Sequence, residues 1–204
     1  MLKSRENISC FLSLSDFFQV KKKMEEQAKL LQALKFAADR HRDQRRKGAH
    51  KPPYINHLIE VIEQLVRVGK VSDSNILLAA VLHDAVEDAV ATAEEIETTF
   101  GKRVCEIVLE VTDDKNLPKQ ERKQQQIEHA PYLSIEAKHI KLSDKISNIR
   151  EIGVDPPIDW DKQQKLDYVA WGEKVVNAGL RGINTDLEKL FDETVKETRL
   201  KIEA

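Results

Sequence analysis

The chain has 204 residues, of which 41% are hydrophobic, 33% charged and 5% aromatic. This balance is typical of a soluble helical protein and excludes the membrane-embedded class, and the length suits one domain with a sizeable core. Thirty-three basic against 35 acidic residues give a formal net charge of -2, so no global field favours nucleic acid or an anionic membrane as a partner.

The first 23 residues differ from the regular pattern that follows. A short apolar run is interrupted by Asp16 and followed by three lysines. This segment lacks the unbroken apolar stretch and the cleavage site of a secretory signal. We therefore expect residues 1–23 to be an amino-terminal tail or extra helix of unassigned role. Over residues 24–41, apolar side chains recur at steps of three and four residues, which predicts the first regular helix.

A basic loop over residues 40–51 follows, with six Lys or Arg residues against one acid, and it is closed by two prolines that forbid a helix. Asn56 is the expected N-cap of a second helix, and Gly69 its expected end. Residues 76–82 are wholly apolar. We expect this third helix to continue through residues 83–89.

The second half of the chain carries clear helix-start signals and no sign of strands. Helices are expected to begin at the Thr92 capping box, near residue 104, at Pro118, at the Ser134 cap, near residue 161 and at a second capping box opened by Thr185. Residues 112–118 read as a turn. No segment alternates with period two and there is no internal repeat, so the sequence predicts an all-α, single-domain bundle of roughly eight to ten helices.

The chain has two cysteines, which limits the disulfide bonds and zinc sites that it can form. Cys10 and Cys105 are too few for a disulfide framework and are not spaced like a zinc site. A reducing, cytoplasmic location is the simplest expectation.

Residues 76–89 are the most informative stretch. On a helix of about 100° per residue, four polar side chains fall within about 140° of one another, while the opposite side is apolar; they are His83, Asp84, Glu87 and Asp88. A buried carboxylate persists only when it is paired or bound to a cation, and a His-Asp pair suits a hard or borderline divalent ion. The alternative is a solvated polar face at the end of a core helix.

A metal ion needs more than two ligands, and two other residues are candidates. His57 follows the expected cap of the second helix. Asp144 shares one helix face with Lys141 and Asn148, within about 60°. Taken alone, His57 is more often a buried core histidine and Asp144 more often a surface charge, so it is their combination with the His-Asp pair that predicts a site.

That combination resembles the HD superfamily of metal-dependent phosphohydrolases, whose helical bundle gathers four ligands from separate helices. The resemblance extends to HRDQRRKGAHKPPYINH, LAAVLHDAVEDA, FGKRV, EVTDDKNLPKQERK, AKHIKLSDKISNIRE and DYVAW. These motifs, in this order, are similar to the hydrolase domain of the RelA/SpoT type, in its stand-alone form, the small alarmone hydrolases. The similarity runs over about residues 24–191, and it implies an HD-type hydrolase domain over residues 24–204.

The resemblance implies an enzyme of defined chemistry. Members of the family remove pyrophosphate from the 3′ position of guanosine tetraphosphate and pentaphosphate (ppGpp and pppGpp), giving GDP or GTP, with one Mn²⁺ ion, and so lower the level of this stringent-response alarmone. By motif position, the metal ligands are His57, His83, Asp84 and Asp144, the acids that align and activate water are Glu87 and Asp88, and the substrate-binding residues are Arg46, Lys47, Lys115, Asn148 and Tyr168. The implied partner is a guanine nucleotide, with neither nucleic acid nor a membrane, and a homo-oligomer is left open.

Three positions depart from the family pattern. Gly48 stands where Asp is usual, Leu58 where Pro is usual and Ala85 where Thr is usual. None of them is an implied metal ligand or catalytic acid, so we expect these departures to affect the affinity for the nucleotide rather than the catalytic step.

The local charge pattern agrees with a phosphorylated substrate. Residues 83–114 contain ten acids and two bases, whereas residues 40–51 and 115–123 are net positive. An acidic segment that binds a cation, between basic segments that bind phosphates, fits a polyphosphate. Two alternatives stay open: a phosphatase acting on another nucleotide, such as removal of the 2′-phosphate from NADPH, and a non-catalytic nucleotide-sensing module.

Overall fold

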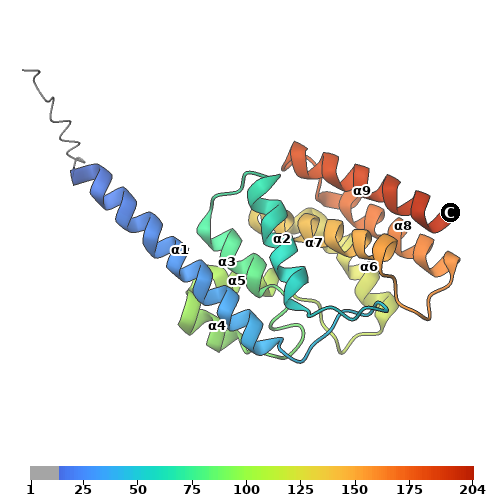
Figure 1. The fold of residues 1–204 in the computed structure, drawn as a ribbon, viewed down its shortest axis with the longest axis horizontal. Coiled ribbons are helices and arrows are strands. Elements are labelled where there is room, and N and C mark those ends of the chain that lie inside the picture. The colour runs from blue at the N-terminus through green and yellow to red at the C-terminus, as the bar shows by residue number, and fades with distance from the viewer. Residues whose placement is uncertain (1–13) are drawn as a thin grey trace, which may run out of the picture.

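The computed structural model describes residues 14–204, which contain nine α-helices and one short 3-10 helix (Figure 1). The helices are α1 Leu14–Arg40, α2 Ile55–Arg67, α3 Ser74–Leu82, α4 Ala93–Phe100, α5 Lys102–Val111, α6 Lys119–His129, η1 Ala130–Tyr132, α7 Ile135–Val154, α8 Lys162–Gly179 and α9 Thr185–Glu203. Over this part of the chain there is no strand, only two isolated β-bridges between loops. The all-α expectation is confirmed.

Helix α7 lies at the centre of the bundle and contacts α2, α3, α5, α8 and α9. Its middle turns are buried on every side, so that Ser143, Asp144 and Lys145 lie inside the protein beside Leu142 and Ile146. A helix surrounded in this way normally carries apolar residues all round. Its buried charged groups must therefore be paired or bind a ligand.

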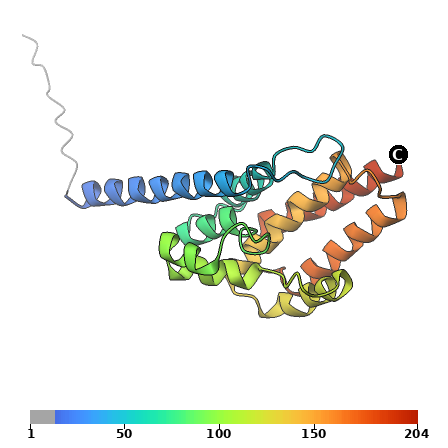
Figure 2. The same ribbon diagram turned by 90° about the horizontal axis from the view of Figure 1, so that it is seen from below.

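Helix α1 is longer than the sequence indicated. It begins at Leu14 rather than at residue 24, and its amino-terminal half projects from the bundle (Figure 2). Only the second half contacts α2 and α3, through the fully buried Ala33 and Ala37. Residues 1–13, with Cys10, lie outside the described part of the chain, and the domain boundary after residue 23 stays a prediction. No helix between residues 14 and 204 combines the length and the apolar character needed to cross a bilayer.

Local signals located most helix starts correctly. The Thr92 and Ser134 side chains accept the backbone N–H groups of Glu95 and Ala137, as N-caps do. The break and turn expected before α6 are present, and α8 begins with a capping box at Asp161, at the expected place.

Two caps differ from expectation. Asn56 lies inside α2, where the residue at the cap position is Tyr54 and makes no side-chain cap bond. The reason is that the Asn56 N–H donates to the Pro53 carbonyl, so that the helix starts two residues earlier than expected. At α9, Asn184 caps the helix in place of Thr185, and the Glu188 carboxylate accepts the N–H groups that precede it.

The expected continuation of α3 through residues 83–89 is wrong. The helix ends at Leu82, and residues 83–89 form successive turns. Ala89 has a φ of 54°, in the left-handed region, and the N–H groups of Val90 and Ala91 both return to the Ala85 carbonyl. Tertiary position therefore overrides helical periodicity at the segment that carries the chemistry.

The basic loop between α1 and α2 is held against the end of α7. The Asp155 carboxylate accepts the backbone N–H of Ala49 at 2.8 Å and that of His50 at 3.1 Å. Backbone hydrogen bonds stabilise the burial of its charge and keep the pKa of Asp155 below its usual value, despite desolvation. A Cβ added at Gly48 would lie 2.2 Å from the Asp155 side chain, so the space that a larger residue would need here is filled by Asp155.

We expect Gly48→Ala to destabilise the protein by about 1–3 kcal/mol, the usual cost of overpacking. Cβ would meet both the carboxylate and the carbonyl oxygen of Asp155, and the latter cannot move without α7. Urea unfolding of Gly48→Ala beside the exposed neighbour variant Ala49→Ser measures the difference. Equal stability of the two variants would contradict the close packing.

Candidate metal centre and active site

Three elements bring two imidazoles and two carboxylates to one point. His57 lies in the first turn of α2, His83 and Asp84 directly follow α3, and Asp144 is in the middle of α7. His57 Nε2 lies 3.2 Å from Asp144 Oδ1, and His83 Nε2 lies 3.2 Å from Asp84 Oδ2. The ligand atoms of His57, His83 and Asp144 all lie within 4.8 Å of one another, which is the arrangement of a cation site.

Outer hydrogen bonds orient both imidazoles towards this point. His83 Nδ1 lies 2.8 Å from the Ala80 carbonyl oxygen, which only accepts, so Nδ1 carries the proton. His57 Nδ1 lies 2.9 Å from Ser147 Oγ, which donates to Glu60 at 2.6 Å. Partners of this kind fix the tautomer and leave the Nε2 lone pair free for a metal ion.

One buried atom shows that the site suits a ligand. His83 Nε2 is buried and makes no hydrogen bond with any described residue, although Asp84 Oδ2 lies 3.2 Å away. Unlike the buried His41 Nε2, which also makes no hydrogen bond, His83 Nε2 lies within 3.7 Å of two carboxylates, those of Asp84 and Asp144, so a cation bound between them would satisfy it. Two imidazole nitrogens and two carboxylate oxygens form a donor set for a borderline or hard divalent cation, so these four residues fit a metal ion.

The two carboxylates are held in their ionised form. Burial works against the charge on Asp84 and Asp144, but the neighbouring imidazoles and, for Asp144, the Lys145 ammonium outweigh it and hold both pKa values well below the usual range. Tyr54 donates its hydroxyl hydrogen to Asp84 Oδ2 at 2.6 Å. Lys145 Nζ lies 3.2 Å from Asp144 Oδ2. Each carboxylate thus has a fixed orientation.

Protons and a metal ion are expected to compete at His83. In the metal-free protein, burial lowers the pKa of His83, but Asp84 and Asp144 outweigh it and raise the pKa to about 10, above the usual value of about 6.5. A protonated His83 therefore stabilises the fold below about pH 6.5, and that contribution is lost as the pH rises towards 10. Metal binding needs the neutral ring and releases protons.

The matching experiment is urea unfolding of metal-free protein across this pH interval, with and without added divalent ion. The free energy of unfolding of the metal-free wild type should fall with rising pH, and the stabilisation by metal should grow. His83→Gln should flatten both trends. A metal-free wild type that follows the same pH dependence as His83→Gln would contradict the expectation.

Two further acids lie beside the centre. Glu87 Oε2 accepts the Asp113 backbone N–H at 3.2 Å, and burial, with the nearby charges of Asp84 and Asp113, raises the pKa of Glu87. The Asp88 carboxylate accepts a hydrogen bond from Lys115 on one oxygen and one of 2.6 Å from Gln44 on the other. The turns over residues 83–89 thus carry both acids close to Asp84 in the chain, although these residues do not form one helix.

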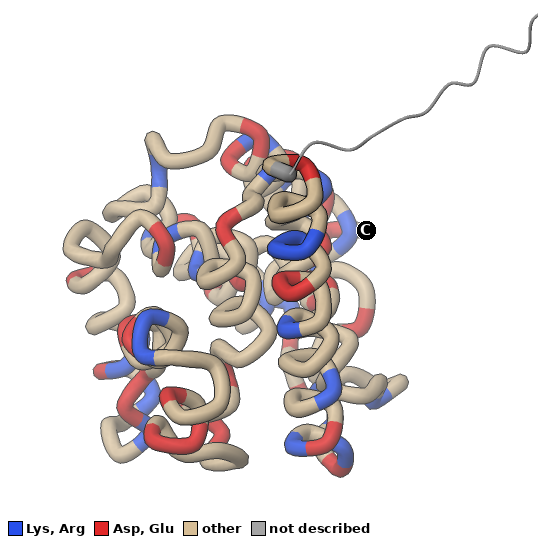
Figure 3. The backbone as a smooth tube through the Cα atoms, turned by 90° about the vertical axis from the view of Figure 1, so that its left-hand side faces the viewer, with Lys and Arg blue, Asp and Glu red and all other residues tan. Residues whose placement is uncertain are grey.

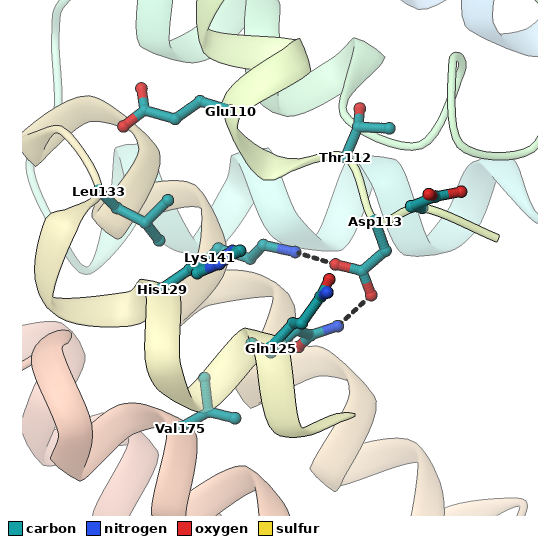
Figure 4. Close-up of a pocket in the computed structure, with 10 residues that line it drawn as sticks. Glu110, Thr112, Asp113, Gln125, His129, Leu133, Lys141 and Val175 are labelled. Atoms are coloured by element: carbon teal, nitrogen blue, oxygen red, sulfur yellow. Dashed lines mark hydrogen bonds and ion pairs between the residues drawn. The ribbon is translucent and has the colours of Figure 1, made fainter. Parts of the chain in front are cut away.

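A cavity of about 240 Å³ is lined by residues of α5, of the turn that follows it, and of α6 and α7. Figure 4 shows the Asp113 carboxylate in it, pointing towards Lys141. Lys141 Nζ lies 3.4 Å from Asp113 Oδ1, and Gln126 donates to the other oxygen. These contacts from α6 and α7 hold the loop whose backbone N–H binds Glu87.

The structure connects most of the expected substrate-binding residues to the centre. Arg46 donates to Asn148 Oδ1 at 2.9 Å, and Asn148 donates to Asp144 Oδ1 at 2.5 Å. Lys115 is bonded to Asp88. Tyr168 is half-buried, and burial together with the Asp144 charge raises its pKa. Lys47 is exposed in the loop and makes no hydrogen bond or ion pair with residues 14–204.

Tyr168 has an aromatic setting that the sequence only partly suggested. Its ring lies 5.4 Å from that of Trp160 and 5.2 Å from that of Trp171. Trp171 itself donates its indole N–H to the Lys123 carbonyl at 3.1 Å and is half-buried. Trp171 therefore packs against the hydrophobic core.

Three residues at the centre had no role assigned from the sequence. They are Gln44, Tyr54 and Lys145, which contact Asp88, Asp84 and Asp144 respectively. Tyr54 and Lys145 stand within the PYINH and KLSDK motifs, so their position was a usable signal. Gln44 stands in the HRDQRRK motif, but its contact with Asp88, 44 positions away, follows from no periodicity.

Figure 3 marks the charged positions along the described backbone, seen from one side. In the view of Figure 3, Lys and Arg positions are interspersed with Asp and Glu positions over the backbone.

Comparison with known proteins identifies the family. A model of the HD domain matches residues 33–169. The chain is 46% identical over 173 residues to a guanosine-3′,5′-bis(diphosphate) 3′-pyrophosphohydrolase, MESH1, of Drosophila melanogaster, covering 85% of this chain and 96% of the relative. It is 45% identical over 177 residues to MESH1 of Homo sapiens, covering 87% of this chain and 98% of the relative.

A solved structure agrees with this result. It is described as a metazoan ortholog of SpoT that hydrolyzes ppGpp and plays a role in starvation responses, and it is 46% identical, with a TM-score of 0.80 over 83% of this chain and 95% of that one. The expected resemblance to HD phosphohydrolases of the RelA/SpoT type is confirmed. The chain belongs to the HD domain family and, within it, to the MESH1 group of guanosine-3′,5′-bis(diphosphate) 3′-pyrophosphohydrolases.

Proposed function

We propose that the protein is a metal-dependent hydrolase that converts ppGpp to GDP, and pppGpp to GTP, by releasing the 3′-pyrophosphate, and thereby lowers the alarmone level. The observation that carries the proposal is the convergence of two imidazoles and two carboxylates beside a second pair of acids. The relatives are named for this reaction.

His57, His83, Asp84 and Asp144 would hold the ion. When bound, a divalent cation lowers the pKa of water and neutralises charge that develops on the phosphoryl oxygens. Tyr54 and the outer partners of the two imidazoles keep these ligands in place. Lys145 balances part of the negative charge of the ligand set.

Glu87 and Asp88 are proposed to align the attacking water and take its proton. The raised pKa of Glu87 makes it a better proton acceptor than an exposed carboxylate near neutral pH. Water oxygen forms a bond to the phosphorus attached to O3′, the bond from that phosphorus to O3′ breaks, and the proton passes through a carboxylate to the leaving O3′. The pH dependence of kcat in Glu87→Gln and Asp88→Asn distinguishes the roles of the two acids.

Basic and polar residues around the centre are proposed to hold the nucleotide. Lys115, whose ammonium pairs with Asp88, is proposed to bind the departing pyrophosphate. Arg46 and Asn148 form a hydrogen-bonded pair next to Asp144, suited to phosphate or ribose oxygens. Lys47 and Tyr168 complete the proposed substrate-binding set.

A substrate panel tests the proposal. Purified protein with Mn²⁺, the ion we propose, is incubated with ppGpp, pppGpp or NADPH, and nucleotide products, pyrophosphate and orthophosphate are quantified. We expect GDP or GTP with equal amounts of pyrophosphate, and a higher kcat/KM for ppGpp than for NADPH. A preference for NADPH would assign the site to 2′-phosphate removal, and binding without turnover of any of the three would favour a nucleotide sensor.

The identity of the ion and the cellular location are also proposals. Repeating the assay with metal-free protein and single ions should give the highest kcat with Mn²⁺ among Mg²⁺, Mn²⁺, Co²⁺ and Zn²⁺. We propose a cytoplasmic location, supported by the low cysteine content and by the buried, free Cys105.

A further inference from the structure

A chain of side-chain contacts leads from the end of α1 to Asp88. His41 is buried, and its ring stacks on that of Tyr54 with centroids 5.2 Å apart and an interplanar angle of 24°. His41 Nδ1 lies 2.6 Å from Gln44 Oε1, and Gln44 Nε2 lies 2.6 Å from Asp88 Oδ2. No other side-chain hydrogen bond joins residues 40–51 to the two acids.

The direction of these hydrogen bonds is determined by Asp88. An ionised carboxylate only accepts hydrogen bonds, so the Gln44 amide must present its NH₂ group to Asp88 and its carbonyl oxygen to His41. His41 Nδ1 must then carry a proton. His41 Nε2 is buried and has no hydrogen-bond partner among the described residues. The contact of Nδ1 with Gln44 is therefore the hydrogen bond that fixes the orientation of the ring.

The backbone fixes the same unit. The His41 N–H donates to the Ala37 carbonyl at 2.9 Å, the Gln44 N–H donates to the His41 carbonyl at 3.0 Å, and the Tyr54 N–H donates to the Gln44 carbonyl at 3.1 Å. His41 and Gln44 are therefore positioned by α1 and by the start of α2. They do not depend on any contact with a nucleotide.

We propose that His41 and Gln44 are positioning residues that hold the Asp88 carboxylate in its reactive orientation during turnover. The inference rests on the proposed role of Asp88. Its two partners are not equivalent, because Lys115 is 45% exposed and is proposed to bind the pyrophosphate, whereas Gln44 is tied to the protein interior. When Lys115 turns to the substrate, Gln44 is the partner that remains on Asp88.

Four variants test this: Gln44→Ala, Gln44→Met, His41→Phe and the double variant His41→Phe/Gln44→Met. Loss of one hydrogen bond to a charged group corresponds to about a tenfold to hundredfold effect. We expect kcat for ppGpp to fall by this factor in both Gln44 variants, with KM within about twofold of wild type. The phenylalanine keeps the stacking on Tyr54 but cannot donate, so kcat should fall, by less than in Gln44→Met.

The double variant distinguishes a connected pair from two separate effects. Because His41 acts through Gln44, the double variant should be no slower than Gln44→Met, whereas independent effects would multiply. The matched control is His139→Phe, which removes a buried histidine whose Nδ1 faces the Ile135 carbonyl of its own helix at 2.8 Å. Its kcat should equal that of the wild type.

Metal content and thermal stability are measured for each variant, to separate positioning from folding. Wild-type kcat in folded, metal-loaded Gln44→Ala and Gln44→Met would overturn the inference, as would a rise in KM alone. Multiplicative loss in the double variant would overturn the role of His41. An inactive wild type would instead overturn the proposed function, which the substrate panel reads out separately.

Discussion

Asp144→Asn is expected to lower kcat/KM for ppGpp by about a thousandfold or more and to leave the protein without bound divalent metal. Asp144 contributes the carboxylate from the central helix α7, and its Oδ1 lies 3.2 Å from His57 Nε2. The amide has nearly the same shape but no charge. Catalysis by a metal ion contributes several kcal/mol to transition-state stabilisation, and each 1.4 kcal/mol corresponds to about tenfold in rate.

The same substitution should also change stability, and in a specific way. Lys145 is buried and its ammonium is paired with Asp144 Oδ2 at 3.2 Å. Removing one partner of a buried pair leaves the other charge uncompensated, at a cost of about 3–5 kcal/mol. Asp144→Asn/Lys145→Met should recover much of that stability without recovering activity.

The control for this pair of experiments is Asp114→Asn, which changes an exposed acid in the turn after α5. Elemental analysis, urea unfolding and the ppGpp assay are run on all variants. Retention of stoichiometric metal and of wild-type kcat/KM by Asp144→Asn would show that the cluster of His57, His83 and Asp144 is not the metal centre.

Glu87→Gln and Asp88→Asn are expected to lower kcat by about 10²–10⁴-fold, the range typical of general acid–base catalysis, while metal content stays at the wild-type level. Neither side chain belongs to the cluster of ligand atoms, and both are held by groups outside it, through Asp113 and Gln44. This result would separate the acids that handle the proton from the residues that hold the ion.

The pH dependence of kcat assigns the roles within the pair. Because burial raises the pKa of Glu87, a base at this position loses activity as the pH falls through a value above the usual range for glutamate, near 4.3. We expect that acidic limb in the wild type and in Asp88→Asn, and its absence from the residual activity of Glu87→Gln. A double variant within tenfold of wild-type kcat would contradict catalysis by these acids.

Much of the architecture could be predicted from local signals. Ser134 and Asp161 mark helix starts because their side chains satisfy free backbone N–H groups, which is a property of a few consecutive residues. The start of α1 could not be predicted in this way, since its projecting half has no packed face to impose a pattern. The turns that replace the expected continuation of α3 end at Ala89, whose left-handed backbone periodicity does not register.

The site divides along the same line. The family motifs assigned roles to the proposed ligands and acids, but not to Gln44, Tyr54 and Lys145, which lie in the same motifs and contact them. The candidate ligands meet only because α2, α3 and α7 pack together; they are His57, His83 and Asp144. The sequence does not show this packing, and the set was predicted from the order of the family motifs. The contacts of Gln44 with Asp88 and of Lys141 with Asp113 join distant parts of the chain through side-chain geometry, and only the structure reveals them.

Hydrolysis of ppGpp in ¹⁸O-labelled water tests the central claim most directly. If water attacks the phosphorus next to O3′ at the metal centre, one ¹⁸O atom enters the pyrophosphate and none enters GDP, and the reaction stops when the metal is removed by chelation and restarts when Mn²⁺ is restored. Mass spectrometry of the two products gives the answer in one experiment. Label in GDP, release of orthophosphate in place of pyrophosphate, or turnover that is indifferent to the metal would contradict the account.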